Sequence, residues 1–271
     1  VPTAVLADTQ AALGPLAQAM AGWPARKLSL TGITGTNGKS TIAWILRRIL
    51  DRAGHTSGLL GTICYEMGTA VTPAVNTTPG PVELATMMTE LLASGGTHLV
   101  MEVSSHGLDQ QRIAGLRFDS AIFTNITGDH LDYHGDMATY LAAKRRLFES
   151  LDASASAIIN RDDPQADAFA DACAGPVVWY GLSPASDYYG RIDRIDAGGS
   201  TFTIITADGD WPIDTPLIGR HNVYNCLAAA CAAASLGVGF ETIVAALHDI
   251  DRIPGRLERV PSEAAFDVFV D

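Results

Sequence analysis

Apolar and polar residues follow two different periods along this chain, and together these periods predict alternating strands and helices. Short apolar runs at 27–33, 97–103 and 121–126 are typical of buried parallel strands. Between such runs, apolar residues recur at helical spacing, as in the predicted helix at 82–93. Strands that alternate with helices indicate βαβ units, so we predict an α/β fold in which helices flank a mostly parallel sheet.

The same reasoning gives the remaining elements. We expect further helices at 11–22, 41–53, 137–151, 223–236 and 240–250, and further strands at 55–63, 157–160 and 177–180. Residues 188–213 alternate apolar and polar positions around two Gly-containing turns, which predicts a smaller antiparallel β section in the second half. The last run, 266–270, predicts a strand that begins a new unit and has nothing after it to pair with.

The composition excludes several classes of partner. The chain has 271 residues, 47% of them hydrophobic, which is enough for one large domain with a sizeable core. Its formal net charge of −12 disfavours nucleic acid and anionic lipid as partners. The longest apolar stretch is too short for membrane insertion. The 4 cysteines form no Cys-x-x-Cys pair and are expected to be reduced and packed, as in a cytoplasmic protein.

The most informative motif is the Gly-rich run LSLTGITGTNGKS at 28–40, which joins a predicted strand to a predicted helix. Loops of this layout wrap phosphate, because backbone N–H groups point into the turn, Lys39 adds a positive charge and Ser40 can offer its hydroxyl to Mg²⁺. The strict pattern G-x-x-x-x-G-K-[ST] is not met, since Ile33 stands where its first glycine would be. The Gly-Lys-Ser-Thr ending still favours nucleotide binding over an ordinary Gly-rich turn.

Acidic and imidazole side chains follow two further predicted strands. Glu102 lies near the end of the run at 97–103, and segment 127–134 (TGDHLDYH) follows the run at 121–126. The carboxyl ends of parallel strands meet at one sheet edge, where ligands bind. A carboxylate beside a phosphate loop is placed to hold Mg²⁺. The alternatives are a structural ion pair for Glu102 and structural roles for the histidines.

Eight sequence blocks occur in an order that matches a known family. They are TGTNGKST (34–41), NTTP (76–79), MEVSSHGLDQQR (101–112), FTNITGDHLDYHG (123–135), AAKRRLF (142–148), NRDD (160–163), GRHNVYNCLAA (219–229) and PGRLE (254–258). Together they resemble the Mur ligases, which join amino acids to the peptidoglycan precursor. The SSHGLDQ and DHLDYHG blocks are most similar to members that add the third residue to UDP-N-acetylmuramoyl-L-alanyl-D-glutamate.

The resemblance implies a P-loop NTPase-like fold and a division of the chain. Residues 1–25 resemble the tail of an N-terminal UDP-sugar domain, residues 26–256 the central ATP-binding domain, and residues 257–271 the truncated start of a C-terminal domain for the incoming amino acid. We expect a monomeric fragment that binds ATP and has little or no ligase activity.

The reaction that the resemblance implies is carboxylate activation by ATP. The γ-phosphate moves to the D-glutamate carboxylate, and the amine of the third amino acid, diaminopimelate or lysine, attacks the resulting acyl phosphate. The alternatives are a related ligase such as folylpolyglutamate synthase, against which the SSHGLDQ and DHLDYHG blocks count, and a non-catalytic nucleotide-binding module.

Matches to the family motifs also suggest binding residues. The nucleotide is expected to contact Gly35, Thr36, Asn37, Gly38, Lys39, Ser40, Thr41, Asn222, Asn225 and Arg256. The UDP-sugar dipeptide is expected to contact Asn76, Thr77, Thr78, Ser104, Gln110 and Arg112. Two bland alternatives stay open, because asparagines at a helix start can be caps and Thr77-Thr78 can simply turn the chain at a proline.

The same matches imply two Mg²⁺ sites and three catalytic residues. Ser40 and Glu102 would hold one ion, and His130 and Lys144 the other, with Lys39, His130 and Lys144 acting in catalysis. On its residue pattern alone, Lys144 is interpreted as a surface lysine of an amphipathic helix. The resemblance instead implies that CO₂ carbamylates it, because an ammonium cannot bind Mg²⁺ whereas a carbamate is an anionic oxygen ligand.

Overall fold

The computed structural model describes residues 5–250, 253–260 and 268–270. The strands are β1 (Ser29–Thr34), β2 (Ser57–Leu60), β3 (Cys64–Met67), β4 (Ala70–Pro73), β5 (His98–Glu102), β6 (Ser120–Phe123), β7 (Ser156–Asn160), β8 (Val177–Gly181), β9 (Tyr188–Asp196), β10 (Gly199–Thr206), β11 (Gly209–Thr215), β12 (Glu258–Val260) and β13 (Val268–Val270). The helices are α1 (Thr9–Met20), the 3₁₀ turn η1 (Pro24–Lys27), α2 (Lys39–Arg52), α3 (Pro81–Ala93), α4 (Ser105–Asp109), α5 (Leu131–His134), α6 (Met137–Glu149), α7 (Ala166–Ala170), α8 (Arg220–Ser235) and α9 (Phe240–His248).

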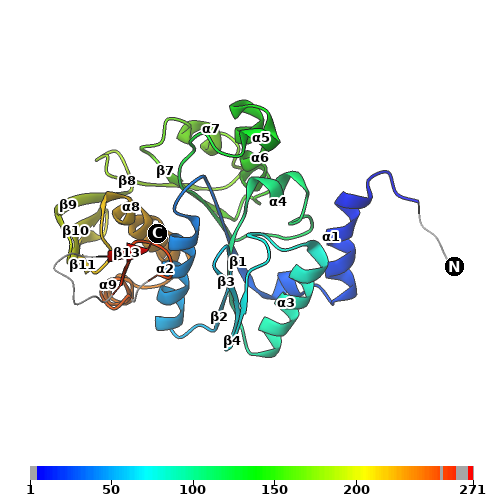
Figure 1. Ribbon diagram of the computed structural model, residues 1–271, viewed down its shortest axis with the longest axis horizontal. Coiled ribbons are helices and arrows are strands. Elements are labelled where there is room, and N and C mark those ends of the chain that lie inside the picture. Colours follow the sequence, from blue (N-terminus) through cyan, green and yellow to red (C-terminus); the bar gives the residue numbers. More distant parts are fainter. Residues whose placement is uncertain (1–4, 251–252, 261–267, 271) are drawn as a thin grey trace.

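An 11-stranded sheet in the order β11-β10-β9-β8-β7-β6-β1-β5-β2-β3-β4 forms the centre of the molecule (Figure 1). The strands from β2 through β5, β1, β6, β7 and β8 to β9 run parallel. Antiparallel strands extend the sheet at both ends, β10 and β11 at one and β3 and β4 at the other. The predicted α/β fold, with its antiparallel section in the second half, is confirmed.

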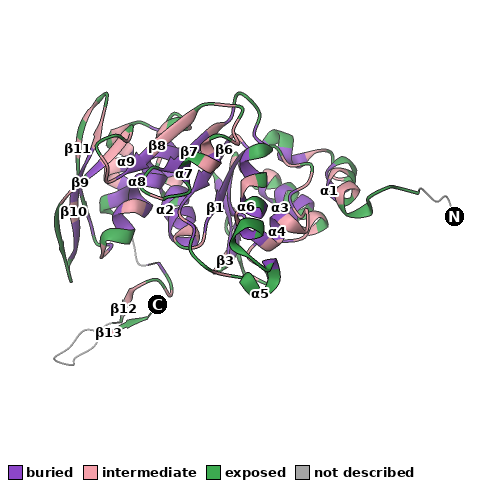
Figure 2. Ribbon diagram, turned by 90° about the horizontal axis from the view of Figure 1, so that it is seen from above, coloured by how far each residue is buried: buried purple, intermediate pink, exposed green. Residues whose placement is uncertain are grey.

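Side chains of the central strands alternate between two hydrophobic cores, one on each face of the sheet. In β5, Val100 belongs to the core shared with α2, α8 and α9, whereas Leu99 and Met101 belong to the core shared with α3, α6 and α7. Figure 2 shows the buried residues concentrated in this central layer. Because both faces of the strands are covered, the strands appear in the sequence as continuous apolar runs.

The structure corrects the predicted elements at several places. Helix α8 begins at Arg220 rather than at residue 223, and β2 is shorter than the predicted strand at 55–63. The β3–β4 hairpin was not predicted, because every residue of β4 is exposed and so no apolar run marks it. The short helices α4, α5 and α7 were also not predicted.

The prediction of an unpartnered strand at the end of the chain is wrong. Strand β13 pairs antiparallel with β12, which precedes it, and the two form a separate sheet (Figure 2). Residues 266–267 of the predicted strand lie outside the described residues.

Two further features concern the described helices and the cysteines. No helix in the described ranges combines the length and apolar character that crossing a membrane requires. All four cysteines are free thiols, with Cys226 and Cys231 buried in α8 and Cys64 and Cys173 half-buried.

A histidine pair at the amino end of β5 makes stability depend on pH. The ring centroids of His55 and His98 lie 4.3 Å apart. Burial, and after it His55, lower the pKa of His98, while Asp119 acts in the opposite direction. In the folded chain, His98 therefore takes up its proton at a lower pH than in the unfolded chain, where the pKa has its ordinary value of 6.5. We expect this contribution to stability to be complete above pH 6.5 and to be lost as the pH falls from there through the lower pKa of the folded state.

Thermal unfolding between about pH 8 and about pH 5 checks this expectation. The variant His98→Gln should lose less thermal stability on acidification than the parent chain. An equal loss in both would contradict the assignment to His98.

Candidate active site

The phosphate loop connects β1 to α2 and has a backbone that needs glycine. Gly35 and Gly38 adopt φ values of +142° and +88°, and a Cβ on Gly35 would lie 1.9 Å from the hydroxyl oxygen of Thr124. Ile33, in place of the first glycine of the strict motif, is a fully buried residue of β1. Since the first N–H groups of a helix have no intrahelical partner, the amides at the start of α2 are available to an anion.

The segment that follows β6 holds the outer part of this loop. Thr36 N donates to Asn125 O at 2.8 Å, and Asn37 N donates to Asn125 Oδ1 at 3.1 Å. In return, Asn37 O accepts from Thr124 Oγ1 at 2.7 Å and from Asn125 Nδ2 at 3.2 Å. The segment after β6 therefore fixes the loop through these four hydrogen bonds.

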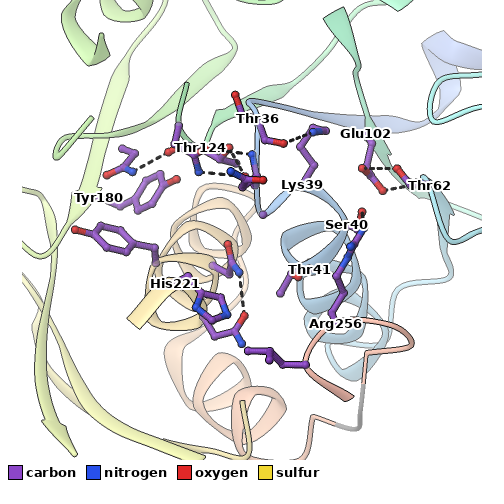
Figure 3. A pocket seen from close by; sticks show the side chains of 18 residues that line it. Thr36, Lys39, Ser40, Thr41, Thr62, Glu102, Thr124, Tyr180, His221 and Arg256 are labelled. Atoms are coloured by element: carbon purple, nitrogen blue, oxygen red, sulfur yellow. Dashed lines mark hydrogen bonds between the residues drawn. The ribbon is translucent and has the colours of Figure 1, made fainter. Parts of the chain in front are cut away.

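A cavity of about 610 Å³ opens beside the phosphate loop, at the carboxyl edge of the parallel strands (Figure 3). Its lining comes from segments that are far apart in the sequence: Thr36, Asn37, Gly38, Lys39, Ser40, Thr41, Thr62, Glu102, Thr124, Asn125, Asn160, Tyr180, His221, Asn222, Tyr224, Asn225, Arg256 and Leu257. The structure thus brings together every predicted nucleotide residue except Gly35, whose carbonyl binds two lysines described below. The size and the mixed lining suit a small-molecule site.

Glu102 ends β5 as a buried carboxylate that faces the cavity. Its Oε1 accepts from Thr62 N at 2.8 Å and its Oε2 accepts from Thr62 Oγ1 at 3.1 Å. Within the described part of the chain, no salt bridge involves Glu102. Ser40 Oγ, which accepts from Arg256 Nη2 at 3.3 Å, also lines the cavity. A carboxylate and a hydroxyl are hard oxygen donors that fit Mg²⁺.

Two lysine side chains converge on one backbone carbonyl of the phosphate loop. Lys39 Nζ donates to Gly35 O at 3.0 Å and to Thr36 O at 2.8 Å, and Lys144 Nζ donates to Gly35 O at 2.8 Å. Lys144 is only 1% exposed, so its interpretation as a surface lysine is wrong. Its Nζ lies 4.5 Å from the ring centroid of Tyr140, on the inner face of α6. Burial, and after it the charge of Lys39, lower the pKa of Lys144 to about 7.

His130 lies at the exposed side of this group. It has a left-handed backbone, with φ of 53°, and its Nε2 is 3.4 Å from Asp129 Oδ2. Its ring centroid is 6.4 Å from that of Tyr140, the ring that Lys144 contacts. No cluster of three or more His, Cys, Asp or Glu side chains in the described ranges is arranged to hold a metal ion. The metal site that combines His130 with a modified Lys144 therefore stays a prediction.

Most of the predicted sugar–peptide residues form a second group next to β5. Thr78 Oγ1 donates to Glu102 O at 3.0 Å and lies 3.1 Å from Ser104 Oγ. Arg112 donates to Thr78 O at 2.6 Å through Nη1 and to Gln110 Oε1 at 2.7 Å through Nη2. Thr78 is fully buried, and its hydroxyl ties the loop before α3 to the end of β5.

Asn76 and Thr77 lie on the loop between the β3–β4 hairpin and α3. Tyr65 Oη donates to Asn76 O at 2.5 Å and accepts from Asn76 N at 2.8 Å. Thr77 Oγ1 lies 3.1 Å from Thr62 Oγ1, and Thr62 in turn binds Glu102. The predicted substrate segment is thereby joined to the carboxylate that faces the cavity.

The two asparagines of α8 are not helix caps. The N-cap residue is Gly219, and no side chain caps this end. Asn222 Nδ2 donates to Ile218 O at 2.8 Å, and Asn225 Nδ2 donates to Asn222 Oδ1 at 3.0 Å. Both side chains are buried and line the cavity, so the cap alternative is wrong.

Sequence reasoning did not identify several residues that line the cavity. Figure 3 shows Tyr180, His221 and Thr124 around the open centre, opposite Glu102 and Thr62. The remaining ones are Thr62, Asn125, Asn160, Tyr224 and Leu257. Most of them fall inside the matched blocks, which was the available signal, but no motif marks their side chains as binding groups.

The parallel sheet and the loop between β1 and α2 define the class of P-loop nucleotide-binding folds. A family model described as the Mur ligase middle domain matches residues 33–233. The chain belongs to the Mur ligase family.

Two curated relatives of this chain carry the same enzyme name. The UDP-N-acetylmuramoyl-L-alanyl-D-glutamate–2,6-diaminopimelate ligase of Geobacillus kaustophilus (strain HTA426) is 40% identical over 277 residues, covering 100% of this chain and 57% of the relative. The ligase of the same name from Geobacter sulfurreducens is 41% identical over 272 residues, covering 97% and 53%. This chain thus spans about half the length of the curated relatives it matches.

Solved structures agree with this relationship. A structure of a ligase with the same name superposes with a TM-score of 0.81 at 30% identity, covering 92% of this chain and 53% of the other. The folylpolyglutamate synthase of Mycobacterium tuberculosis superposes with a TM-score of 0.77 over 97% of this chain and 66% of the other, at 19% identity. The second likeness shows a shared fold alone.

Proposed function

We propose that the chain is the ATP-binding central part of a ligase that adds the third amino acid to UDP-N-acetylmuramoyl-L-alanyl-D-glutamate. One observation carries this proposal: Lys39 of the phosphate loop and the buried carboxylate of Glu102 line one cavity, and the buried Lys144 shares the carbonyl of Gly35 with Lys39. The names of the relatives suggest diaminopimelate as the added amino acid. Precursor synthesis of this kind is cytoplasmic, and the surface charge is compatible with that compartment.

The residues of the phosphate loop would bind and orient the transferring phosphate. The amides at the start of α2 would hold phosphate oxygens, and Lys39 would move from the loop carbonyls to the γ-phosphate as the charge there develops. Ser40 and Glu102 would hold Mg²⁺, which would neutralise phosphate charge. Arg112, already held by Gln110, presents a planar fork that suits a substrate carboxylate or phosphate.

Lys144 would supply a further oxygen ligand after carbamylation. Reaction with CO₂ needs a neutral amine, and a pKa of about 7 leaves much of this amine neutral at neutral pH. The cause is the dry environment between Tyr140 and the phosphate loop. His130, on the exposed side of Tyr140, would be its partner in holding the second ion.

The domain division is part of the same proposal. Residues 26–256 would form the central domain, with residues 1–25 and 257–271 as flanks from its two neighbours. The competing function is a non-catalytic nucleotide-binding module, which the chain would resemble if catalysis needs the parts of the relatives that it does not cover. Folylpolyglutamate synthase is the less favoured alternative, because that likeness rests on the fold alone.

Ligand-induced stabilisation and a substrate assay test the proposal. Mg-ATP at about 100 times its Kd should stabilise the chain by about 2.7 kcal/mol. In the complete ligase, ADP release should require both the UDP-sugar dipeptide and diaminopimelate, and folates should not replace them. If Mg-ATP does not stabilise the chain against unfolding, nucleotide binding is rejected. If a folate drives ADP release, the UDP-sugar dipeptide is rejected as the substrate class.

A further inference from the structure

The NRDD block at 160–163 has no role in the function described so far, yet it contacts the segment that holds the phosphate loop. Asn160 Nδ2 donates to Thr124 O at 2.7 Å, and Asp163 Oδ2 accepts from Ile126 N at 2.9 Å. These two hydrogen bonds hold the backbone on either side of Asn125. Asn125 itself makes three of the hydrogen bonds to Thr36 and Asn37 of the loop.

Hydrogen bonds within the NRDD turn and to the residue that follows its proline hold the turn itself in place. The second oxygen of Asp163 accepts from Gln165 N at 2.8 Å, and Asn160 Oδ1 accepts from Asp162 N at 3.1 Å. Asn160 is 7% exposed and Ile126 is 9% exposed, so the Asn160–Thr124 bond is buried and the Ile126–Asp163 bond is partly buried. A donor or acceptor that loses its partner in such a place costs free energy, which favours the native arrangement.

We propose that Asn160 and Asp163 are positioning residues for nucleotide binding, which act on the phosphate loop through residues 124–126. Asp163 does not line the cavity, so it acts on bound phosphate only through Asn125. The chain of contacts runs from the β7–α7 turn to the segment after β6 and then to Thr36 and Asn37. The proposal rests on the nucleotide-binding part of the proposed function and is independent of the amino acid that the ligase adds.

Without the carboxylate of Asp163, Ile126 N is left unpaired and Asn125 gains freedom to move. The loop then samples arrangements that do not bind phosphate, and the apparent affinity falls with the fraction of competent loop. We expect Asp163→Ala to weaken Mg-ATP binding on the order of tenfold. Asp163→Asn keeps one carbonyl oxygen as an acceptor and should restore part of the affinity.

Asp119, which immediately precedes β6 and bonds to β1, offers a matched control. Its Oδ2 accepts from Leu30 N at 3.0 Å, which is the same kind of bond at the opposite end of β1. Asp119→Ala removes the same charge and one carboxylate–amide bond, far from the phosphate loop. It should lower the melting temperature without changing the Kd for Mg-ATP.

Two measurements on the intact chain test the proposal: titration calorimetry with Mg-ATP, and hydrogen exchange at the amides of Thr36 and Asn37. Asp163→Ala should weaken binding and speed exchange at both amides, Asp163→Asn should do so less, and Asp119→Ala should do neither. Equal affinity and equal exchange in Asp163→Ala and the parent, or the same changes in Asp119→Ala, overturn the proposal. If the parent does not bind Mg-ATP, the proposed function fails, while the exchange rates still decide whether Asp163 fixes the loop.

Discussion

Replacing Lys39 with alanine is expected to weaken Mg-ATP binding by roughly 30- to 1000-fold, the equivalent of about 2–4 kcal/mol. Lys39 is the lysine of the phosphate loop; it is partly buried, which lowers the pKa of its ammonium, and it donates to Thr36 O. In the variant, bound phosphate would lose its nearest fixed positive charge in a site where water cannot replace it. Titration calorimetry on the chain gives the two dissociation constants.

The control for this change is Lys27→Ala, which removes the same charge from an exposed position in η1. Its affinity for Mg-ATP should match that of the parent chain. A Kd for Lys39→Ala within about threefold of the parent would show that the loop does not bind phosphate in the proposed way.

Lys144 is expected to carry a carbamate at neutral pH, and Lys144→Ala is expected to abolish activity of the complete ligase. With a pKa of about 7, close to half of the amine is neutral at pH 7, compared with about 0.03% for a lysine at its ordinary value of 10.5. Protonation removes the reactive form as the pH falls below 7, so the modified fraction should decrease toward acid pH. Carbon-13 NMR with labelled bicarbonate detects the carbamate directly.

Two results would argue against this role for Lys144. The labelled signal should be missing in Lys144→Arg, so a signal of equal size in that variant would place the modification elsewhere. Short carboxylates should restore part of the activity of Lys144→Ala, because they can supply the missing oxygen ligand. Full activity of that variant without any added carboxylate would remove the carbamate from the mechanism.

The sequence was sufficient for the main elements of the fold because its strands are buried on both faces. The apolar run at 97–103, for example, predicts β5 with an error of one residue at each end. The β3–β4 hairpin lacks such a signal, since β4 is exposed along its whole length and the hairpin depends on its pairing with β2. Short helices such as α4 and α5 are too brief for a helical period to be visible.

The candidate site was predictable to the extent that local motifs reflect chemistry. The phosphate loop and Glu102 could be found from their place after predicted strands. The burial of Lys144 could not, because it depends on how α6 packs against the loop between β1 and α2. The same holds for Tyr180 and His221, which reach the cavity only through the order of strands in the sheet and the position of α8.

The place of β1 in the sheet has a consequence for how the chain reaches its native state. Its partners on either side, β5 and β6, come much later in the chain, with Ile33 beside Glu102 in one pairing and Thr34 beside Phe123 in the other. Long stretches of chain must therefore be closed, at a cost in entropy, before these contacts form, and parallel sheets of this kind fold slowly. Because Asn125 and the Asn160–Asp163 turn can hold the phosphate loop only after that closure, we expect competence to bind nucleotide to appear only once these strands have paired.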